Sequence, residues 1–215
     1  MKVLFLTNEY PPNIYGGAGV HVSYLSRELA KTMPVEVRCF GNQRIEEGNL
    51  RVIGFDVDTS NFTCPKPLRS AFGAVGRCTD FNTMNIDADL VHCHTWYTHF
   101  GGILAKKNYA IPLVITVHSL EPLRPWKREQ LAGGYDFSLW VEKTALEMAD
   151  AVVGIALEAE PLLQAEAGRH PRVRIGAAQD EHQRVQRDQH VEERGQREAL
   201  IGRRHDRRRD QRRRD

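Results

Sequence analysis

The last part of the 215-residue sequence lacks most of the residues from which protein cores are built. Residues 155–215 contain no aromatic residue and no Ser, Thr or Cys, yet they hold half of the 30 Lys and Arg residues, all of them as Arg. Large apolar side chains supply most of the free energy that offsets chain entropy, so this composition excludes an ordinary core. We therefore expect a folded domain over residues 1–154 and an Arg-rich tail, disordered or non-native, over residues 155–215.

Two explanations of the tail remain open. Its joint loss of Lys, Ser, Thr and aromatic residues favours an out-of-frame reading of a GC-rich gene, because selection for a fold does not explain that combination. The alternative is a genuine basic arm that binds nucleic acid. Asp and Glu interrupt the arginines and no aromatic side chain is present for base stacking, so we do not expect a nucleic-acid partner. Residues 156–167 keep a composition that favours a helix.

The sequence also lacks long apolar runs, a regular cysteine pattern and a strong net charge. Its four cysteines have irregular spacings, which is typical of reduced thiols in a cytosolic protein. The apolar run after Met1 is too short for a signal peptide, and no segment approaches the ~20 apolar residues of a membrane span. A formal net charge of +2 does not indicate a nucleic-acid or membrane surface. We expect a cytoplasmic protein without a membrane partner, whose oligomeric state the sequence leaves open.

Within residues 1–154, short apolar runs alternate with segments of helical spacing. Strands are predicted for residues 3–6, 35–40, 50–55, 88–93 and 113–117, with a further strand starting at 151–154. Helices are predicted for residues 17–31, 99–109 and about 137–148, whereas 56–86 is ambiguous with a helix-like spacing of Leu68, Phe72 and Val75. This alternation predicts an α/β fold with a doubly wound, Rossmann-like parallel sheet.

Polar side chains directly follow three of the predicted strands. Ligands of an open parallel sheet bind at the carboxyl ends of its strands, where these groups would converge. They are Asn8 and Glu9 after the first strand, His94 and Thr95 after residue 93, and His118 and Ser119 after residue 117. Each signal alone is weak, since His118 could be a structural histidine, but together they predict a ligand site.

His92 and His94 alternate onto one face of their strand, and Cys93 points to the other. Two imidazoles at this spacing make a metal site conceivable. No third ligand stands at a fixed nearby spacing, so we expect no bound metal. We place Cys93 in the core.

The glycine-rich run YGGAGV, residues 15–20, precedes a predicted helix and offers backbone N–H groups to an anion. A plain turn is the simpler alternative. A nicotinamide-binding fingerprint is excluded on three counts. Val22 occupies the third glycine position, the run begins well beyond the first strand, and residues 40–42 contain no acidic residue for a ribose.

Several segments resemble one family. Residues 2–12 (KVLFLTNEYPP), 15–21 (YGGAGVH) and 91–97 (VHCHTWY) are similar to the amino-terminal domain of bacterial glycogen synthases and their relatives, which are retaining glycosyltransferases of the GT-B fold. Residues 117–127 (VHSLEPLRPWK) resemble the subgroup that makes glycogen or maltose 1-phosphate from ADP-glucose. The likeness covers residues 1 to about 153, and it implies the first half of a GT-B fold.

This resemblance implies the transfer of glucose from ADP-glucose to an α-1,4-glucan, or to glucose 1-phosphate to give maltose 1-phosphate. The sugar nucleotide and the glucan or sugar phosphate are then the partners, with no cofactor and no metal. The resemblance makes His118 the catalytic histidine that contacts the transferred glucose. The matching residues are Gly16, Gly17, Ala18 and His118 on the donor side, and Glu9, His94, Trp96 and Tyr97 on the acceptor side. Tyr15 stands where the larger branch of the family has a Lys, which favours the smaller branch.

The second domain of that family, with a basic pair on the donor phosphates and a Glu-x7-Glu segment, is not recognisable in this sequence. We therefore expect no turnover from this chain alone. Two other functions stay open. One is a non-catalytic truncated remnant that retains the fold, and the other is a GT-B transferase that uses a different acceptor, such as a lipid or a small metabolite.

Overall fold

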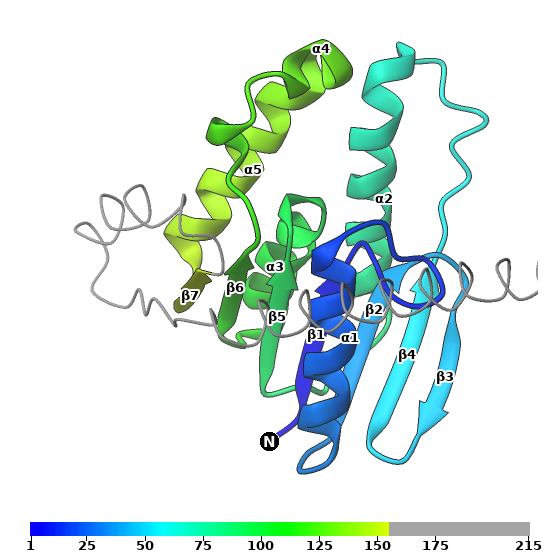
Figure 1. Ribbon diagram of the computed structural model, residues 1–215, viewed down its shortest axis with the longest axis vertical. Coiled ribbons are helices and arrows are strands. Elements are labelled where there is room, and N and C mark those ends of the chain that lie inside the picture. The colour runs from blue at the N-terminus through cyan, green and yellow to red at the C-terminus, as the bar shows by residue number, and fades with distance from the viewer. Residues whose placement is uncertain (155–215) are drawn as a thin grey trace, which may run out of the picture. The chain divides into compact units, whose positions relative to one another are not determined.

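A seven-stranded sheet organises residues 1–154, the part of the chain that the computed structural model describes. The strand order is β3-β4-β2-β1-β5-β6-β7, and all neighbouring strands are parallel except β3 and β4 (Figure 1). The strands are β1 (Val3–Thr7), β2 (Val35–Phe40), β3 (Arg44–Glu47), β4 (Leu50–Phe55), β5 (Leu90–His94), β6 (Leu113–Val117) and β7 (Ala151–Gly154).

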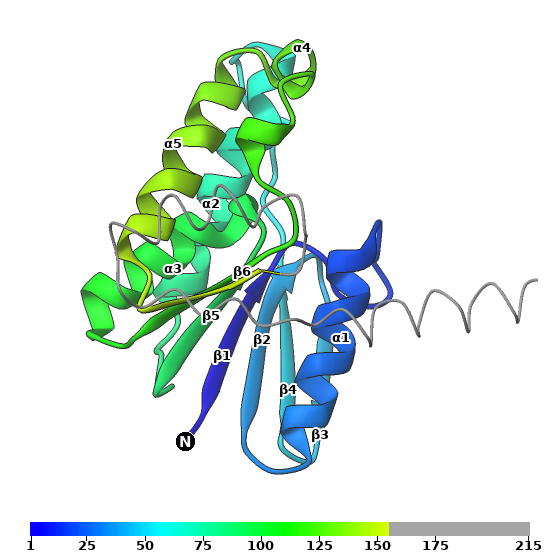
Figure 2. The ribbon, with the colours of Figure 1, turned by 60° about the vertical axis from the view of Figure 1, so that its left-hand side comes forward.

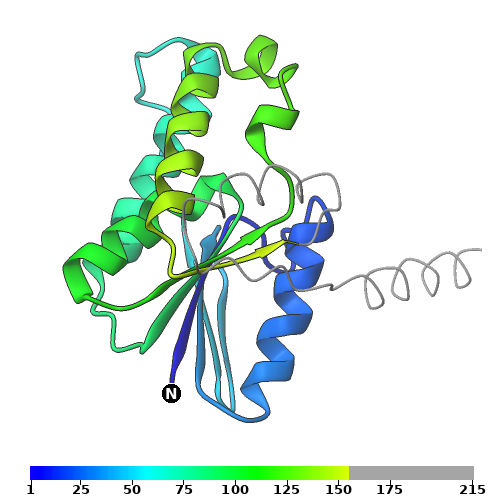
Figure 3. The same cartoon turned by 90° about the vertical axis from the view of Figure 1, so that its left-hand side faces the viewer.

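Helices cover both faces of the sheet. Helix α1 (Gly17–Ala30) lies on one face, and α2 (Arg69–Thr83), α3 (Trp96–Tyr109) and α5 (Gly133–Met148) lie together on the other (Figures 2 and 3). Three short helices, η1 (Lys66–Leu68), η2 (Glu121–Leu123) and α4 (Lys127–Leu131), lie in connections that follow strand ends. A mostly parallel sheet between two helical layers confirms the predicted doubly wound, Rossmann-like α/β fold.

The inner strands have continuous runs of apolar residues because both of their faces are buried. In β1, Val3 and Phe5 belong to a core cluster that includes Val22 of α1, whereas Leu4 and Leu6 belong to the cluster under the three other long helices. Burying a Leu or Phe side chain contributes roughly 1.5–3 kcal/mol. The two clusters therefore hold the helices against opposite faces of the sheet.

Most predicted elements are present, with shifted ends. The strand predicted at 88–93 is Leu90–His94, and the helix predicted at 99–109 begins earlier, at Trp96. The ambiguous stretch 56–86 contains η1 and α2, but Phe72 is 50% exposed because α2 buries another face, which includes Ala74 and Phe81. The antiparallel strand β3 was not predicted, since it is short, polar and mostly exposed. The predicted tail, residues 155–215, lies outside the described residues.

The sheet order places β1, β5 and β6 side by side. Leu6 pairs with Cys93, and His94 pairs with Thr116. Because these strands are parallel, their carboxyl ends meet at one edge of the sheet, the upper edge in Figure 1. The polar residues that follow the three strands are thereby brought to one edge, as predicted. None of the helices within residues 1–154 has the length and apolar character needed to cross a bilayer.

Candidate active site

Four histidines gather on the α1 side of the sheet. His94 ends β5 and His118 follows β6, and Nδ1 of His94 lies 3.1 Å from Nε2 of His118. His21 of α1 approaches both rings, with centroid distances of 5.7 Å to His94 and 5.3 Å to His118. The His92 ring packs 4.5 Å from that of His94. Two histidines that the sequence assigned to one ligand edge are thus joined by a hydrogen bond.

Burial determines the protonation state of the inner histidines. It lowers the pKa of His94 well below the ordinary value, and the neighbouring histidines add to this effect. Burial also lowers the pKa of His92 to about 3, and its Nε2 lies 2.7 Å from the Thr116 hydroxyl. Both imidazoles are therefore neutral at physiological pH. Among residues 1–154, no group of three or more His, Cys, Asp or Glu side chains is arranged to hold a metal ion.

The glycine-rich run is held from inside the protein by Glu9. Helix α1 begins at Gly17, and Gly16 precedes it with an extended backbone. The Glu9 carboxylate, 8% exposed, accepts hydrogen bonds from the backbone N–H groups of Tyr15 and Gly16, both at 2.9 Å and through one oxygen. A carboxylate of the chain itself therefore satisfies two of the amides that the sequence offered to an external anion. Gly16 and Gly17 remain exposed on the outer side of the loop.

A strained residue joins the ends of β1 and β5. Thr95 has φ 68° and ψ 153°, a combination nearly confined to glycine. Its hydroxyl donates to the side-chain oxygen of Asn8 at 2.8 Å. Strain of this kind costs on the order of 1–3 kcal/mol and persists only where the surroundings over-determine it. The turn fixes where α3 begins, and so it positions Tyr97 at the carboxyl edge.

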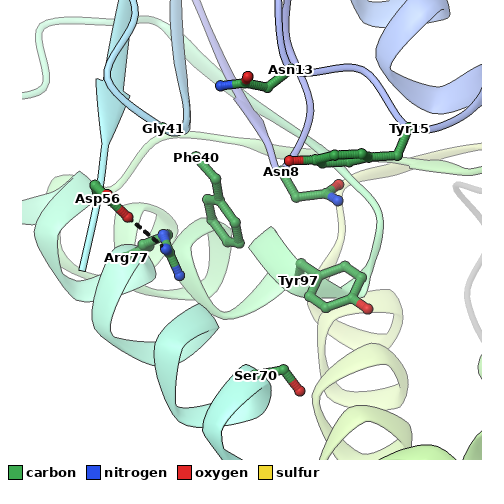
Figure 4. Close-up of a pocket in the computed structure, with 9 residues that line it drawn as sticks. All are labelled: Asn8, Asn13, Tyr15, Phe40, Gly41, Asp56, Ser70, Arg77 and Tyr97. Carbon is green, nitrogen blue, oxygen red and sulfur yellow. Dashed lines mark hydrogen bonds and ion pairs between the residues drawn. The ribbon is translucent and has the colours of Figure 1, made fainter. Parts of the chain in front are cut away.

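A pocket of about 310 Å³ lies at the carboxyl ends of β1, β2 and β4 (Figure 4). Three aromatic side chains and several polar groups line it. The lining residues are Asn8, Asn13, Tyr15, Phe40, Gly41, Asp56, Ser70, Arg77 and Tyr97. The Arg77 guanidinium lies 4.8 Å from the centre of the Phe40 ring and pairs with Asp56 at 2.8 Å. Because Asp56 balances Arg77, the pocket combines aromatic and polar side chains that together carry no net charge.

A buried ionic cluster holds the segment that follows β6. Glu121, 1% exposed, accepts hydrogen bonds from Lys127 Nζ at 2.8 Å and from the Ser138 hydroxyl at 2.9 Å. Its backbone N–H donates to Glu142 at 2.8 Å, and burial raises the pKa of Glu142 to about 8. Lys127 Nζ also lies 5.8 Å from the centre of the Tyr97 ring. The cluster ties η2 and α4 to α5 and supports one wall of the pocket.

Comparison with known proteins identifies the family. Residues 15–175 match Glycosyltransferase Family 4. This chain belongs to that family. The matched region includes the glycine loop and both histidine segments, and it extends past residue 154 into the part of the chain that the structure does not describe. The resemblance to GT-B glycosyltransferases is confirmed.

Curated relatives of this family 4 chain include two kinds of synthase. It is 47% identical over 160 residues to the alpha-maltose-1-phosphate synthase of Mycolicibacterium smegmatis, which covers 73% of this chain and 38% of the relative. It is 29% identical over 142 residues to the glycogen synthase of Mycobacterium tuberculosis, covering 56% and 34%. The chain therefore spans less than two fifths of the length of these relatives.

The solved structures agree on the fold. The sucrose-phosphate synthase from Thermosynechococcus elongatus superimposes with a TM-score of 0.59 at 18% identity, covering 81% of this chain and 47% of that one. At this identity the likeness extends to the fold alone. The family 4 chain therefore shares its sheet architecture with this structure, and its site has to be argued from its own residues.

The structure brings some of the predicted site residues together and separates others. Tyr97 lines the pocket, and its predicted acceptor-side role stays a prediction. Trp96 is 4% exposed and is not among the lining residues. Its ring stacks on that of Tyr97 with a centroid distance of 4.2 Å, so it supports Tyr97 on the side away from the pocket. Glu9 bonds to the glycine loop, a contact that the sequence did not predict.

Sequence reasoning missed part of the pocket wall in this family 4 chain. Phe40 and Asp56 lie at the ends of β2 and β4, so the rule that ligands bind beyond strand ends would have found them. Ser70 and Arg77 come from α2, a segment whose sequence was ambiguous. No local pattern marks them, because their place in the pocket depends on how α2 packs.

Proposed function

We propose that this chain carries one wall of the active site of a hexosyltransferase that moves glucose from ADP-glucose to an α-1,4-glucan or to glucose 1-phosphate. The observation that carries the proposal is the hydrogen-bonded pair His94–His118 beside α1, whose first residues form the glycine loop. The 47% identity to an alpha-maltose-1-phosphate synthase supports this chemistry. A cytoplasmic location, where sugar nucleotides are made and used, belongs to the same proposal.

The donor lies at the glycine loop and His118. A side chain at Gly16 would meet no atom within 4 Å, so this part of the loop has room for a ligand. The first residues of α1 add the positive end of the helix dipole, which favours a diphosphate. His118 then binds the glucose that is transferred. Stabilising the sugar cation and the leaving diphosphate needs further charged groups, which we assign to a part of the enzyme beyond residues 1–154.

The acceptor sugar occupies the pocket lined by Phe40 and Tyr97. Aromatic faces together with amide and hydroxyl groups suit a sugar ring, because the ring has both C–H and O–H surfaces. The charge of Arg77 is already balanced by Asp56, which favours a neutral glucosyl unit over a bare phosphate. Both proposed acceptors present such a unit.

Calorimetric titration of the full 215-residue chain tests the proposal, with maltose, glucose 1-phosphate and ADP-glucose as separate ligands. Tyr97→Ala should weaken binding of maltose about tenfold, equivalent to about 1.4 kcal/mol, and leave ADP-glucose unaffected. His118→Ala should do the reverse. Tyr24→Ala is the matched control, because Tyr24 is an exposed aromatic residue of α1 outside the pocket. Absence of saturable binding for all three ligands would refute the proposal.

Glucosyl transfer by the same chain should stay at background if, as we propose, the charged groups that stabilise the leaving diphosphate belong to another part of the enzyme. A chain that binds maltose without turnover fits this expectation. Turnover at ordinary enzymatic rates would show that the 215-residue chain already contains a complete active site.

A further inference from the structure

The contact between His94 and His118 leaves open which of the two nitrogens carries the shared proton. Two imidazole nitrogens 3.1 Å apart share one hydrogen bond, so one nitrogen must carry the proton and the other must accept it. The choice determines what His118 can do with its second nitrogen. If Nε2 of a neutral His118 accepts, its proton is on Nδ1, and that nitrogen is a donor.

The surroundings of His94 favour one arrangement. His94 is fully buried, and its Nε2 has no hydrogen-bond partner among residues 1–154. A proton on that nitrogen would bury an N–H donor without an acceptor, at a cost of about 1–3 kcal/mol. A proton on Nδ1 instead lies inside the hydrogen bond to His118, and Nε2 keeps only a lone pair. An orphaned acceptor is the milder defect, as it is for backbone groups.

The packing around His94 prevents its ring from turning to another hydrogen-bond partner. The rings of Phe5 and His92 lie 5.5 Å and 4.5 Å from its ring, and His21 closes a third side at 5.7 Å. Burial keeps the pKa of His94 well below the ordinary value, so it carries a single proton. His94 therefore acts as a neutral donor from a fixed direction.

We infer that His94 is a positioning residue that donates from Nδ1 to Nε2 of His118 and so holds His118 in the tautomer protonated on Nδ1. His118 then meets a ligand as a neutral N–H donor, suited to a sugar hydroxyl or a phosphate oxygen, and not as a base that removes a proton from the acceptor. The role toward a sugar rests on the proposed function. The tautomer itself does not, because it is a property of the unliganded chain.

Nitrogen NMR of the full chain, with histidine labelled in the ring nitrogens, measures the tautomer directly. His118→Gln identifies the signals of His118 by their loss. The expected spectrum shows a protonated, pyrrole-type Nδ1 and an unprotonated, pyridine-type Nε2 for His118. A protonated Nε2 of His118 in the wild-type chain would overturn the inference, and the variant serves only to assign the signals.

Two variants of His94 that are nearly isosteric with each other then test whether His94 sets this tautomer. His94→Asn keeps an N–H donor where Nδ1 lies, and His118 should stay protonated on Nδ1. His94→Asp places a carboxylate there, and His118 should now carry a proton on Nε2. His92→Asn is the matched control, since His92 lies on the same face of β5 and bonds to Thr116 instead of His118. If the Asn and Asp variants leave His118 in the same state, His94 does not set its tautomer.

Discussion

Glu9 and Gly19 form the contact that shapes the glycine loop. A Cβ atom at position 19 would lie 2.8 Å from Cβ of Glu9 and 2.9 Å from its carboxylate. Only a glycine lets α1 pass this close, and the closeness lets Glu9 reach the N–H groups of Tyr15 and Gly16. Of the glycines in the run, Gly19 is thus required by packing, whereas Gly16 faces open space.

Gly19→Ala should displace Glu9 and break its two hydrogen bonds to the loop. Overpacking of this kind costs about 1–3 kcal/mol, so we expect a loss of that size in the free energy of unfolding measured with urea. Gly16→Ala is the control, because its extended backbone and open surroundings accept a methyl group. An equal loss in the two variants would contradict the role assigned to Glu9.

The connection from β6 to α5 is held by buried charges as well as by the apolar side chain of Leu120. Two buried carboxylates, Glu121 and Glu142, face one buried ammonium, that of Lys127, and the half-exposed Arg124 lies 3.7 Å from Glu121. One of the carboxylates therefore gains by keeping its proton. Burial and the charge of Glu121 raise the pKa of Glu142 to about 8, while its bond to the Glu121 N–H, Lys127 and Arg124 oppose the shift.

This shift makes stability depend on pH. Between the ordinary value of 4.5 and about 8, folded Glu142 keeps a proton that the unfolded chain has lost. Stability should therefore fall as pH rises through that window, and each unit of pKa shift corresponds to about 1.4 kcal/mol. Glu142→Gln should flatten the dependence and melt higher than wild type above about pH 8, as followed by circular dichroism.

Glu147→Gln provides the comparison for that measurement. Glu147 lies on α5 as well, but its side chain is 44% exposed and pairs loosely with Lys143 at 3.9 Å. Its replacement should leave the pH dependence of melting as in wild type. If Glu142→Gln behaves in the same way as this control, Glu142 is ionised in the folded protein.

At the scale of the whole described domain, Arg38 connects the layers. It lies on β2, is 1% exposed and pairs with Glu36 at 2.7 Å. Its guanidinium also donates to the backbone oxygens of Phe81, Met84 and Asn85 at the carboxyl end of α2. One buried side chain therefore satisfies the last carbonyls of a helix and fixes that helix to the sheet.

Arg38→Met should destabilise the domain by about 3–5 kcal/mol in urea, because it removes the closer of the two cations paired with buried Glu36 and leaves only Lys2, at 3.1 Å. The double variant Glu36→Gln/Arg38→Met should recover part of this loss, since no buried carboxylate is then left with a weakened ionic partnership. Arg51→Met, at an arginine that is about half exposed, should change little. A double variant no more stable than Arg38→Met would show that the helix carbonyls, and not Glu36, account for the effect.

Local sequence patterns predicted the positions of helices and strands better than they predicted which face of a helix is buried. The helix at Gly133–Met148 was predicted from a stripe that included Phe137 and Trp140, yet Trp140 is 55% exposed and the buried face contains Glu142 and Ser138. Hydrophobic spacing cannot find a face that is buried through ion pairs and hydrogen bonds. Strand β3 was not predicted for a related reason, since an exposed edge strand needs no apolar side chains.

The sequence by itself determined the parallel sheet, the strand ends that carry His94 and His118, and the family resemblance, because each depends on residues close together in the chain. Only the tertiary structure decided which groups meet. It turned Glu9 toward the glycine loop, placed Arg77 of α2 opposite Phe40 of β2, and hydrogen-bonded His94 to His118. These contacts join residues from different strands and helices, and their geometry is set by how the layers pack.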